Sequence, residues 1–301
     1  MTTAQQNILK VLAYFDVFNY PLTTEEIRSF LLEPNEFTFE KTLHELLEEK
    51  IIFKLDIFYS LQNDPLLVER RCKGNKFAAE QMSTAAKAAS ILSHFPYVRG
   101  LAISGSLSKN FADEKADVDF FIITAANRLW IARTIMHLFK KLSFVAGKEN
   151  WFCMNYYVDE AMIEIPEKNI FTAMEIVTLI PMYGQKIFPI FYYKNEWTKE
   201  YFPSKTTANC NAMENEKGFF SRMIEKIFNG KRGNAIDNWL MDLTDKRWKK
   251  KTEKNRLNAR GIKMTLKANK HFSKPDPTNF QNRVVQQYES KLQQLITVAV
   301  N

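Results

Sequence analysis

A Gly-Ser pair and an Asp-x-Asp triplet are the features of this 301-residue sequence best suited to chemistry. Gly105 and Ser106 end an apolar run, and ten residues separate Ser106 from Asp117. Asp117 and Asp119 flank Val118, and since side chains two apart on a strand share a face, we expect their carboxylates to lie together. Two such carboxylates repel each other unless a cation joins them. The spacing therefore predicts a site for Mg²⁺ or Mn²⁺, hard ions that prefer carboxylate and phosphate oxygens.

The Gly-Ser pair has the properties of a phosphate-binding turn. Gly105 lets the backbone approach phosphate oxygens closely. Ser106, at an expected helix N-terminus, offers a hydroxyl and free N–H groups to the same anion. Lys109 is the nearest cation in the sequence, where contact with a phosphate competes with the commoner role of a solvated lysine. We take these three residues as candidates for binding the anionic part of a substrate.

Two buried strands must position these groups. Residues 98–104 (VRGLAIS) and 116–124 (ADVDFFIIT) are short apolar runs without helical periodicity, and four consecutive apolar residues at 120–123 indicate burial on both faces. Helical patterns occupy 66–94, 127–145 and 170–182, and further strands are expected at 152–158 and 162–165. Alternating strands and helices predict an α/β core of the α+β type, with a mixed sheet, over residues 65–205.

Gly-Ser, a ten-residue spacer and an Asp-x-Asp with apolar flanks are together similar to the signature of the DNA polymerase beta-like nucleotidyltransferase superfamily. The resemblance covers residues 98–165, and the flanking stretches look like those of its uncharacterised bacterial branch. It implies a nucleotidyltransferase core in which Asp117 and Asp119 bind two Mg²⁺ ions. Those ions would clamp the triphosphate of an NTP and polarise an acceptor hydroxyl for attack on the α-phosphate, releasing pyrophosphate.

The superfamily usually adds a third carboxylate from a later strand, and two positions compete for that role. Glu164 has the apolar flanks of a strand residue, whereas Asn155 lies on the more convincing strand but carries an amide. An amide binds metal less tightly and cannot act as a general base. Two functions therefore stay open: transfer of an NMP from an NTP to an unknown acceptor hydroxyl, or a catalytically degenerate fold that binds a nucleotide, RNA or a protein.

The first segment, residues 1–64, reads as three helices and a hairpin, an order that resembles a winged helix-turn-helix. Thr23 or Thr24 is a suitable N-cap for the second helix, because two glutamates follow in its first turn. The expected third helix and its end carry four glutamates against two lysines (Glu40, Glu45, Glu48 and Glu49; Lys41 and Lys50). A surface that faces phosphates needs net positive charge. We therefore expect a docking or structural segment and no binding of duplex DNA.

The last segment, residues 206–301, is expected to be basic and helical, with helices at 219–228, 235–244 and 280–298. Its densest cationic run begins at Lys246 and continues to Arg256. Two interpretations stay open for this run. It is either a solvated helix face or a contact with a polyanionic acceptor such as RNA, on whose bases Trp248 could stack.

The composition is that of a packed globular protein, with 46% hydrophobic and 25% charged residues and a net charge of +8. Cys72, Cys153 and Cys210 are far apart and form no CxxC pair, so we expect reduced thiols and no zinc site. The polar start after Met1 and the lack of a long apolar run predict neither a signal peptide nor a membrane span, and a cytoplasmic location.

Overall fold

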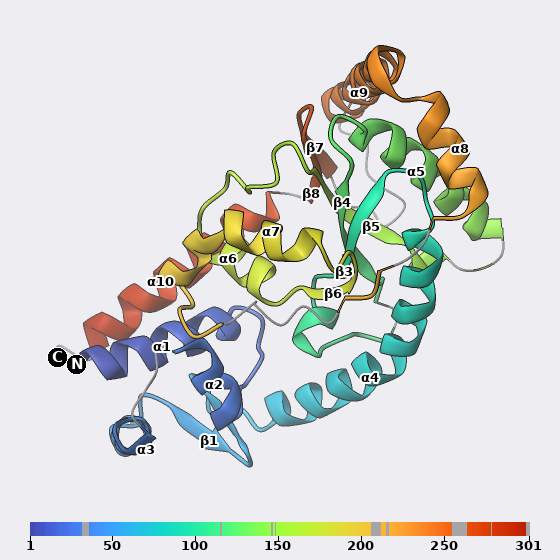
Figure 1. The fold of residues 1–301 in the computed structure, drawn as a ribbon. Coiled ribbons are helices and arrows are strands. Elements are labelled where there is room, and N and C mark those ends of the chain that lie inside the picture. Colours follow the sequence, from blue (N-terminus) through green and yellow to red (C-terminus); the bar gives the residue numbers. More distant parts are fainter. Residues whose placement is uncertain are drawn as a thin grey trace.

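The computed structural model describes residues 1–31, 36–114, 116–145, 147, 149–205, 212–214, 217–254, 264–277 and 279–298. At its centre lies a six-stranded mixed sheet with the strand order β6-β3-β4-β5-β8-β7, and helices cover both faces (Figure 1). The expected α+β class with a mixed sheet is confirmed at this level. Among the helices of the described residues, none is both long and apolar enough to cross a membrane.

The central strands explain why the Gly-Ser turn meets the Asp-x-Asp segment. β3 (Val98–Ile103) and β4 (Asp119–Thr124) are antiparallel neighbours, with Ile103 opposite Phe120. The chain therefore leaves β3 at the end where β4 begins, and the Ser104 N–H donates to the Asp119 carbonyl over 2.9 Å. β5 (Cys153–Asp159) runs parallel to β4 on its other side, with Cys153 opposite Asp119. Three chain segments thus meet at one end of the sheet.

Three strands of the sheet differ from the sequence expectation or were not foreseen. The helix expected at 170–182 ends as α6 (Ile170–Val177), and β6 (Ile180–Tyr183) pairs with the free edge of β3. β7 (Met264–Ala268) and β8 (Phe272–Pro277) extend the sheet beyond β5, so the C-terminal segment is not wholly helical. β6 and β8 satisfy backbone groups of the distant strands β3 and β5, which a local apolar pattern does not reveal, and β7 pairs with β8.

The strand expected at 162–165 is not formed. The chain turns after β5, where the Asp159 carboxylate accepts hydrogen bonds from the N–H groups of Ala161 and Met162 at 3.0 and 3.2 Å. Asn195 then accepts from the Ile165 N–H over 2.8 Å. These side-chain contacts satisfy backbone donors that a strand would otherwise have paired.

The two faces of the sheet carry separate apolar cores. Phe120 and Ile122 of β4 lie with residues of α4 (Leu66–Ser93) and α5 (Leu129–Val145). Phe121 and Ile123, on the opposite face, lie with residues of α6, α7 (Ile187–Lys194) and the N-terminal helices. The alternation follows from the two-residue period of a strand. It confirms the expectation of burial on both faces.

The N-terminal segment contains the three helices and the hairpin expected from its sequence. They are α1 (Thr3–Asp16), α2 (Thr24–Phe30), α3 (Glu36–Glu48), β1 (Phe53–Leu55) and β2 (Phe58–Ser60). Thr23 is the N-cap of α2, in a reciprocal capping box with Glu26. The likeness to a winged helix remains an interpretation.

A buried arginine joins this segment to α4. Arg71 is 3% exposed, pairs with Glu26 at 2.5 Å and donates to the Pro21 carbonyl over 2.6 Å. Its guanidinium also stacks on the Tyr20 ring, 3.8 Å from the centroid. Because both the charge and the hydrogen-bond donors of Arg71 are matched, its burial holds the N-terminal segment in place. α1 is held from the other side by α10 (Phe280–Val298), through the ion pair of Asp16 with Lys291.

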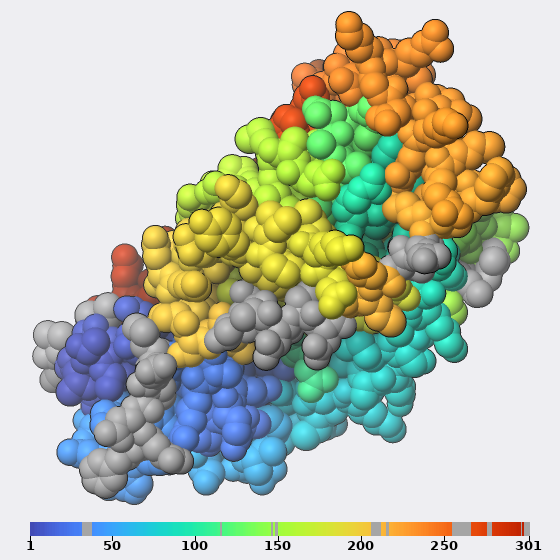
Figure 2. Space-filling model, in the orientation of Figure 1, coloured from blue at the N-terminus to red at the C-terminus, as the bar shows by residue number. Residues whose placement is uncertain are grey.

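The remaining helices complete the layers. α8 (Phe219–Ile227) and α9 (Gly230–Glu253) lie beside α5, at the end of the molecule far from the N-terminal helices (Figure 2). The Asp237 carboxylate of α9 accepts the Ile131 N–H of α5 over 2.9 Å. Short 3₁₀ helices η1 (Leu107–Lys109), η2 (Glu149–Trp151) and η3 (Glu196–Glu200) connect the larger elements.

Candidate active site

The Gly-Ser turn is built against Asp119. Gly105 adopts a φ of +68°, in the left-handed region that favours glycine. A Cβ added at this position would lie 2.5 Å from Oδ2 of Asp119, closer than any normal contact. The expected helix after Ser106 is only the three-residue η1. The close approach of the Gly105 turn to the Asp119 carboxylate therefore shapes this part of the site more than a helix dipole does.

We expect Gly105→Ala to lower the melting temperature and to displace the Asp119 carboxylate. Left-handed backbone costs a non-glycine residue about 1–2 kcal/mol, and the collision with Oδ2 adds to that cost. Gly230→Ala is the matched control, because Gly230 has a φ of +65° with no atom within 4 Å of an added Cβ. Thermal unfolding of both variants separates strain from collision. Equal losses in the two variants would contradict a close Asp119 contact.

Asp119 is held by the neighbouring strand. The Asn155 side-chain amide donates to Oδ1 of Asp119 over 2.6 Å, and the Cys153 thiol donates to the Asn155 amide oxygen over 3.2 Å. Burial, with smaller contributions from the nearby Asp117 and Glu175 carboxylates, raises the pKa of Asp119 to about 7. Asp119 is therefore poised between its neutral and charged forms near neutral pH, a state that a bound cation would shift to the charged form.

The cysteines of the described residues agree with the expectation of reduced thiols. Cys72 and Cys153 are both free, and Cys210 lies outside the described residues. Burial raises the pKa of Cys153 to about 12, and the Asp119 carboxylate adds to the effect. The Cys153 thiol therefore stays protonated and serves as a hydrogen-bond donor beside the site.

Lys109 lies in the same site as one half of an ion pair. Its ammonium donates to the Gly105 carbonyl over 3.0 Å and to the Glu175 carboxylate of α6 over 2.7 Å. The Tyr20 hydroxyl donates to the Lys109 carbonyl over 2.6 Å, so the N-terminal segment helps to position η1. The side chain of Lys109 is only 15% exposed, which makes it a structured cation and not a solvated one.

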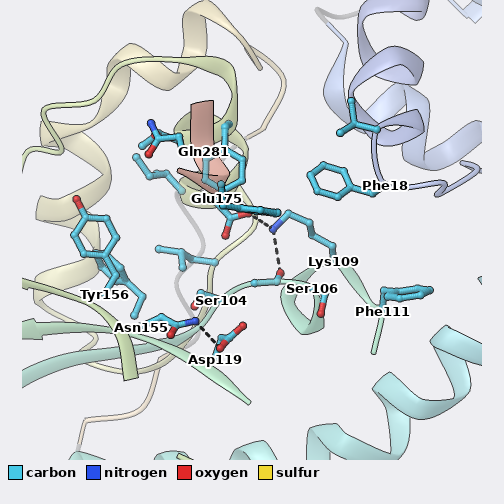
Figure 3. A pocket seen from close by; sticks show the side chains of 18 of the residues that line it. Phe18, Ser104, Ser106, Lys109, Phe111, Asp119, Asn155, Tyr156, Glu175 and Gln281 are labelled. Atoms are coloured by element: carbon cyan, nitrogen blue, oxygen red, sulfur yellow. Dashed lines mark hydrogen bonds and ion pairs between the residues drawn. The ribbon is translucent and has the colours of Figure 1, made fainter. Parts of the chain in front are cut away.

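These groups line one cavity of about 670 Å³ between the sheet, α6, α10 and the N-terminal segment. Its floor carries Asp119 and Asn155, and Lys109 reaches across toward Glu175 (Figure 3). Arg70 of α4 and Lys274 of β8 add two further cations to the wall. Eight aromatic side chains from different parts of the chain contribute to the rest of the wall (Phe15, Phe18, Tyr20, Phe111, Phe121, Tyr156, Phe171 and Phe280). Apolar walls with a few convergent polar groups are typical of small-molecule sites.

Five of the seven candidate residues come together in this cavity: Gly105, Ser106, Lys109, Asp119 and Asn155. The other two, Asp117 and Glu164, do not line it. Asp117 precedes β4 and is not part of the strand, so it does not share a strand face with Asp119, although its charge acts on the pKa of Asp119.

Glu164, a candidate for the third carboxylate, does not line the cavity. Glu164 is 51% exposed and pairs with Lys168 over 2.8 Å, while its neighbours Ile163 and Ile165 are buried. Glu175 lines the cavity in its place and was missed by sequence reasoning. A signal was present, because Glu175 is the single charged residue in the otherwise apolar α6, IFTAMEIV. When such a helix is buried, its one charged side chain needs a partner of opposite charge.

Among the described residues, no three histidine, cysteine or carboxylate side chains converge closely enough to hold a metal ion by themselves. An ion in this cavity would therefore take part of its coordination from other oxygen ligands, such as water or a substrate. No family model, curated protein or solved structure matches this chain significantly. Function is therefore inferred from the residues of the cavity.

Proposed function

We propose that the protein is a metal-dependent nucleotidyltransferase that moves an NMP from an NTP to an acceptor hydroxyl and releases pyrophosphate. The proposal is carried by one juxtaposition: the Gly105 turn lies directly against the Asp119 carboxylate at the floor of an aromatic cavity. A phosphate-binding turn and a cation-binding carboxylate within one site are the two parts that phosphoryl transfer requires.

The turn supplies the groups for the triphosphate. Within the described residues, the N–H groups of Gly105 and Ser106 make no hydrogen bond, and both residues line the cavity. N–H groups without a protein partner at a cavity wall can donate to an anion, which would replace the water around them. Lys109 adds a full positive charge from the same turn.

The residues fit a divalent cation that is shared with the substrate. Mg²⁺ is usually held by one or two carboxylates and by substrate phosphates, and it retains several waters. Asp119 would be the principal ligand, with Asp117 as a second carboxylate beside it. When bound, the ion would neutralise charge on the phosphates and polarise the acceptor oxygen. Such an arrangement does not require three metal-binding side chains from the protein.

The Lys109–Glu175 ion pair gives the site two forms. A phosphate that enters the turn competes with Glu175 for the Lys109 ammonium, which now lies 2.7 Å from the carboxylate. Once Lys109 pairs with phosphate, Glu175 becomes free to accept the proton of the acceptor hydroxyl. Glu175, and not Glu164, is thus the carboxylate we propose as general base.

The aromatic walls suit the flat, apolar parts of the reactants. A nucleobase can stack on rings such as Phe18 or Tyr156, both of which line the cavity. The aromatic lining does not specify the acceptor. A polyanionic acceptor such as RNA would use the cations of the C-terminal segment as a second contact.

Thermal unfolding with each of the four NTPs, with and without Mg²⁺ or Mn²⁺, tests the proposal. One NTP is expected to raise the melting temperature by several degrees only when the metal is present. An NTP at a hundred times its dissociation constant stabilises the folded state by about 2.7 kcal/mol. The Asp117→Ala, Asp119→Ala double variant should show no such shift.

The matched control is the Glu164→Ala, Asp245→Ala double variant. It removes the same charge from two half-exposed carboxylates outside the cavity and should keep the full shift. If no NTP stabilises the native chain with either metal, or if both double variants behave alike, the proposed site is not where nucleotide binds.

One observation favours a second candidate, a catalytically degenerate fold that binds a nucleotide or RNA without transfer. Asn155 occupies the strand beside Asp119 and donates its amide to Oδ1, where a carboxylate would have provided a further metal ligand. In that case the divalent ion does not contribute to ligand binding, and the Asp119→Asn variant binds the ligand as the native chain does. Metal-independent binding of an NTP, without release of pyrophosphate, would identify this candidate.

A further inference from the structure

A second cavity, of about 730 Å³, lies between α5 and α9. It is on the sheet face opposite the candidate active site, because α5 packs on Phe120 and Ile122 whereas the first cavity is lined by Phe121. Figure 1 shows α5 and α9 together, away from α1 and α6. The two cavities are therefore separate sites.

The lining of this second cavity is cationic. Among its described residues are six cations and no carboxylate (Arg133, Lys141, Arg247, Lys250, Lys251 and Lys254). None of these six forms an ion pair with a carboxylate of the described residues. The nearest acids along α9, Asp245 and Glu253, do not line the cavity, and Asp245 pairs with Lys249 over 2.7 Å. Like charges gathered around one space repel each other, and a bound anion would relieve that repulsion.

The α5 side of the cavity is partly withdrawn from water. Burial lowers the pKa of Arg133 and lowers that of His137 well below its ordinary value, with Arg133 adding to the effect on His137. Nε2 of His137 is buried and has no hydrogen-bond partner among the described residues. Because this atom is shielded from solvent, it does not itself reach a ligand in the cavity. The attraction for an anion comes from the cations that line the space.

We propose that this cavity binds a chain of linked phosphate groups. The ligand is either a free oligophosphate or the backbone of a single-stranded nucleic acid, since both present several phosphates at short, regular intervals. Arginine suits this role because its planar fork matches phosphate oxygens, and Arg133 and Arg247 approach the cavity from different helices. The inference does not depend on Asp119 or on nucleotidyl transfer.

Titration with two probes tests the proposal: inorganic tripolyphosphate, and a fluorescein-labelled twelve-residue oligouridylate. Both are run in EDTA, so that metal-dependent binding at Asp119 does not contribute, and they are repeated with Asp119→Ala. The test variant is Arg247→Gln, Lys251→Gln, whose side chains lie at the exposed rim of the cavity. The matched control is Lys231→Gln, Arg232→Gln, which makes the same charge change on exposed residues at the other end of α9.

We expect at least one probe to bind the native chain and the Asp119→Ala variant equally. The cavity variant should bind it on the order of tenfold more weakly at about 0.1 M salt. For the oligouridylate, the slope of log affinity against log salt should fall by about 1.4, since each lost phosphate contact removes about 0.7 from a single-strand slope. The control variant should keep native affinity.

The pattern across probes identifies the source of the phosphates. Binding of tripolyphosphate with weak binding of the oligouridylate supports a free oligophosphate, and the reverse supports a nucleic acid strand. Failure of both probes to bind at 50 mM salt overturns the proposal. Equal weakening in the cavity and control variants also overturns it, because the attraction would then reflect net charge and no particular site.

Discussion

Asp119→Asn is expected to reduce NMP transfer by at least about 10²–10³-fold, the loss typical when one electrostatic group is removed from an active site. Asparagine keeps an oxygen that can accept the Asn155 amide, now 2.6 Å from Oδ1, and has nearly the same volume. It removes only the charge that a divalent ion would require. Incorporation of label from an α-³²P-labelled NTP, offered with total RNA or with a mixture of hydroxylated metabolites, measures the rate.

Asp113→Asn provides the comparison. Asp113 also lines the cavity but is exposed at its edge, so its loss should change the rate only a few-fold. If Asp119→Asn retains transfer within tenfold of the native rate, the carboxylate is not central to the chemistry. Retained ligand binding without any transfer in the native chain would instead favour the binding fold over the enzyme.

In the absence of divalent ions, the folded protein should lose stability as pH rises from about 4 through about 7. The pKa of Asp119 is raised in the folded state from 3.8 to about 7, chiefly by burial. A raised pKa contributes stability that is fully present below the unfolded value and is lost as pH rises through the folded value. Each unit of difference between the folded and unfolded pKa corresponds to about 1.4 kcal/mol. The raised pKa of Asp119 therefore lowers the free energy of unfolding by up to about 4 kcal/mol at pH 8.

Urea unfolding at pH 5 and pH 8, in EDTA and in Mg²⁺, measures this effect. Asp119→Asn should unfold at a higher urea concentration than the native chain at pH 8 in EDTA, because it carries no charge to bury. The two should be similar at pH 4. Mg²⁺ should restore stability to the native chain and leave the variant unchanged. A variant less stable than the native chain at pH 8 in EDTA would show that the Asp119 charge is already compensated.

Much of the architecture could be predicted from local patterns. The capped helix that begins after Thr23, the apolar runs that became β3 and β4, and the long helices between them depend on residues close together in the chain. The Gly105 turn was predictable for the same reason, because the end of one strand and the start of the next are both marked by composition. Local periodicity did not identify β6 or β8, which pair with the distant strands β3 and β5, or β7, which pairs with β8.

The sequence by itself identified five residues of the cavity, Asp119 and four others. The antiparallel pair β3 and β4 brings the Gly-Ser turn to Asp119, and the parallel neighbour β5 brings Asn155. Only the tertiary structure decided that Glu175 faces the cavity and Glu164 faces solvent, since that choice depends on which side of α6 is buried and on a turn at Asp159. It also decided that aromatic side chains of the N-terminal segment and of α10 join those of β4, β5 and α6 in the cavity wall. Contacts between residues more than a hundred positions apart are set by packing of the whole chain, and no local pattern encodes them.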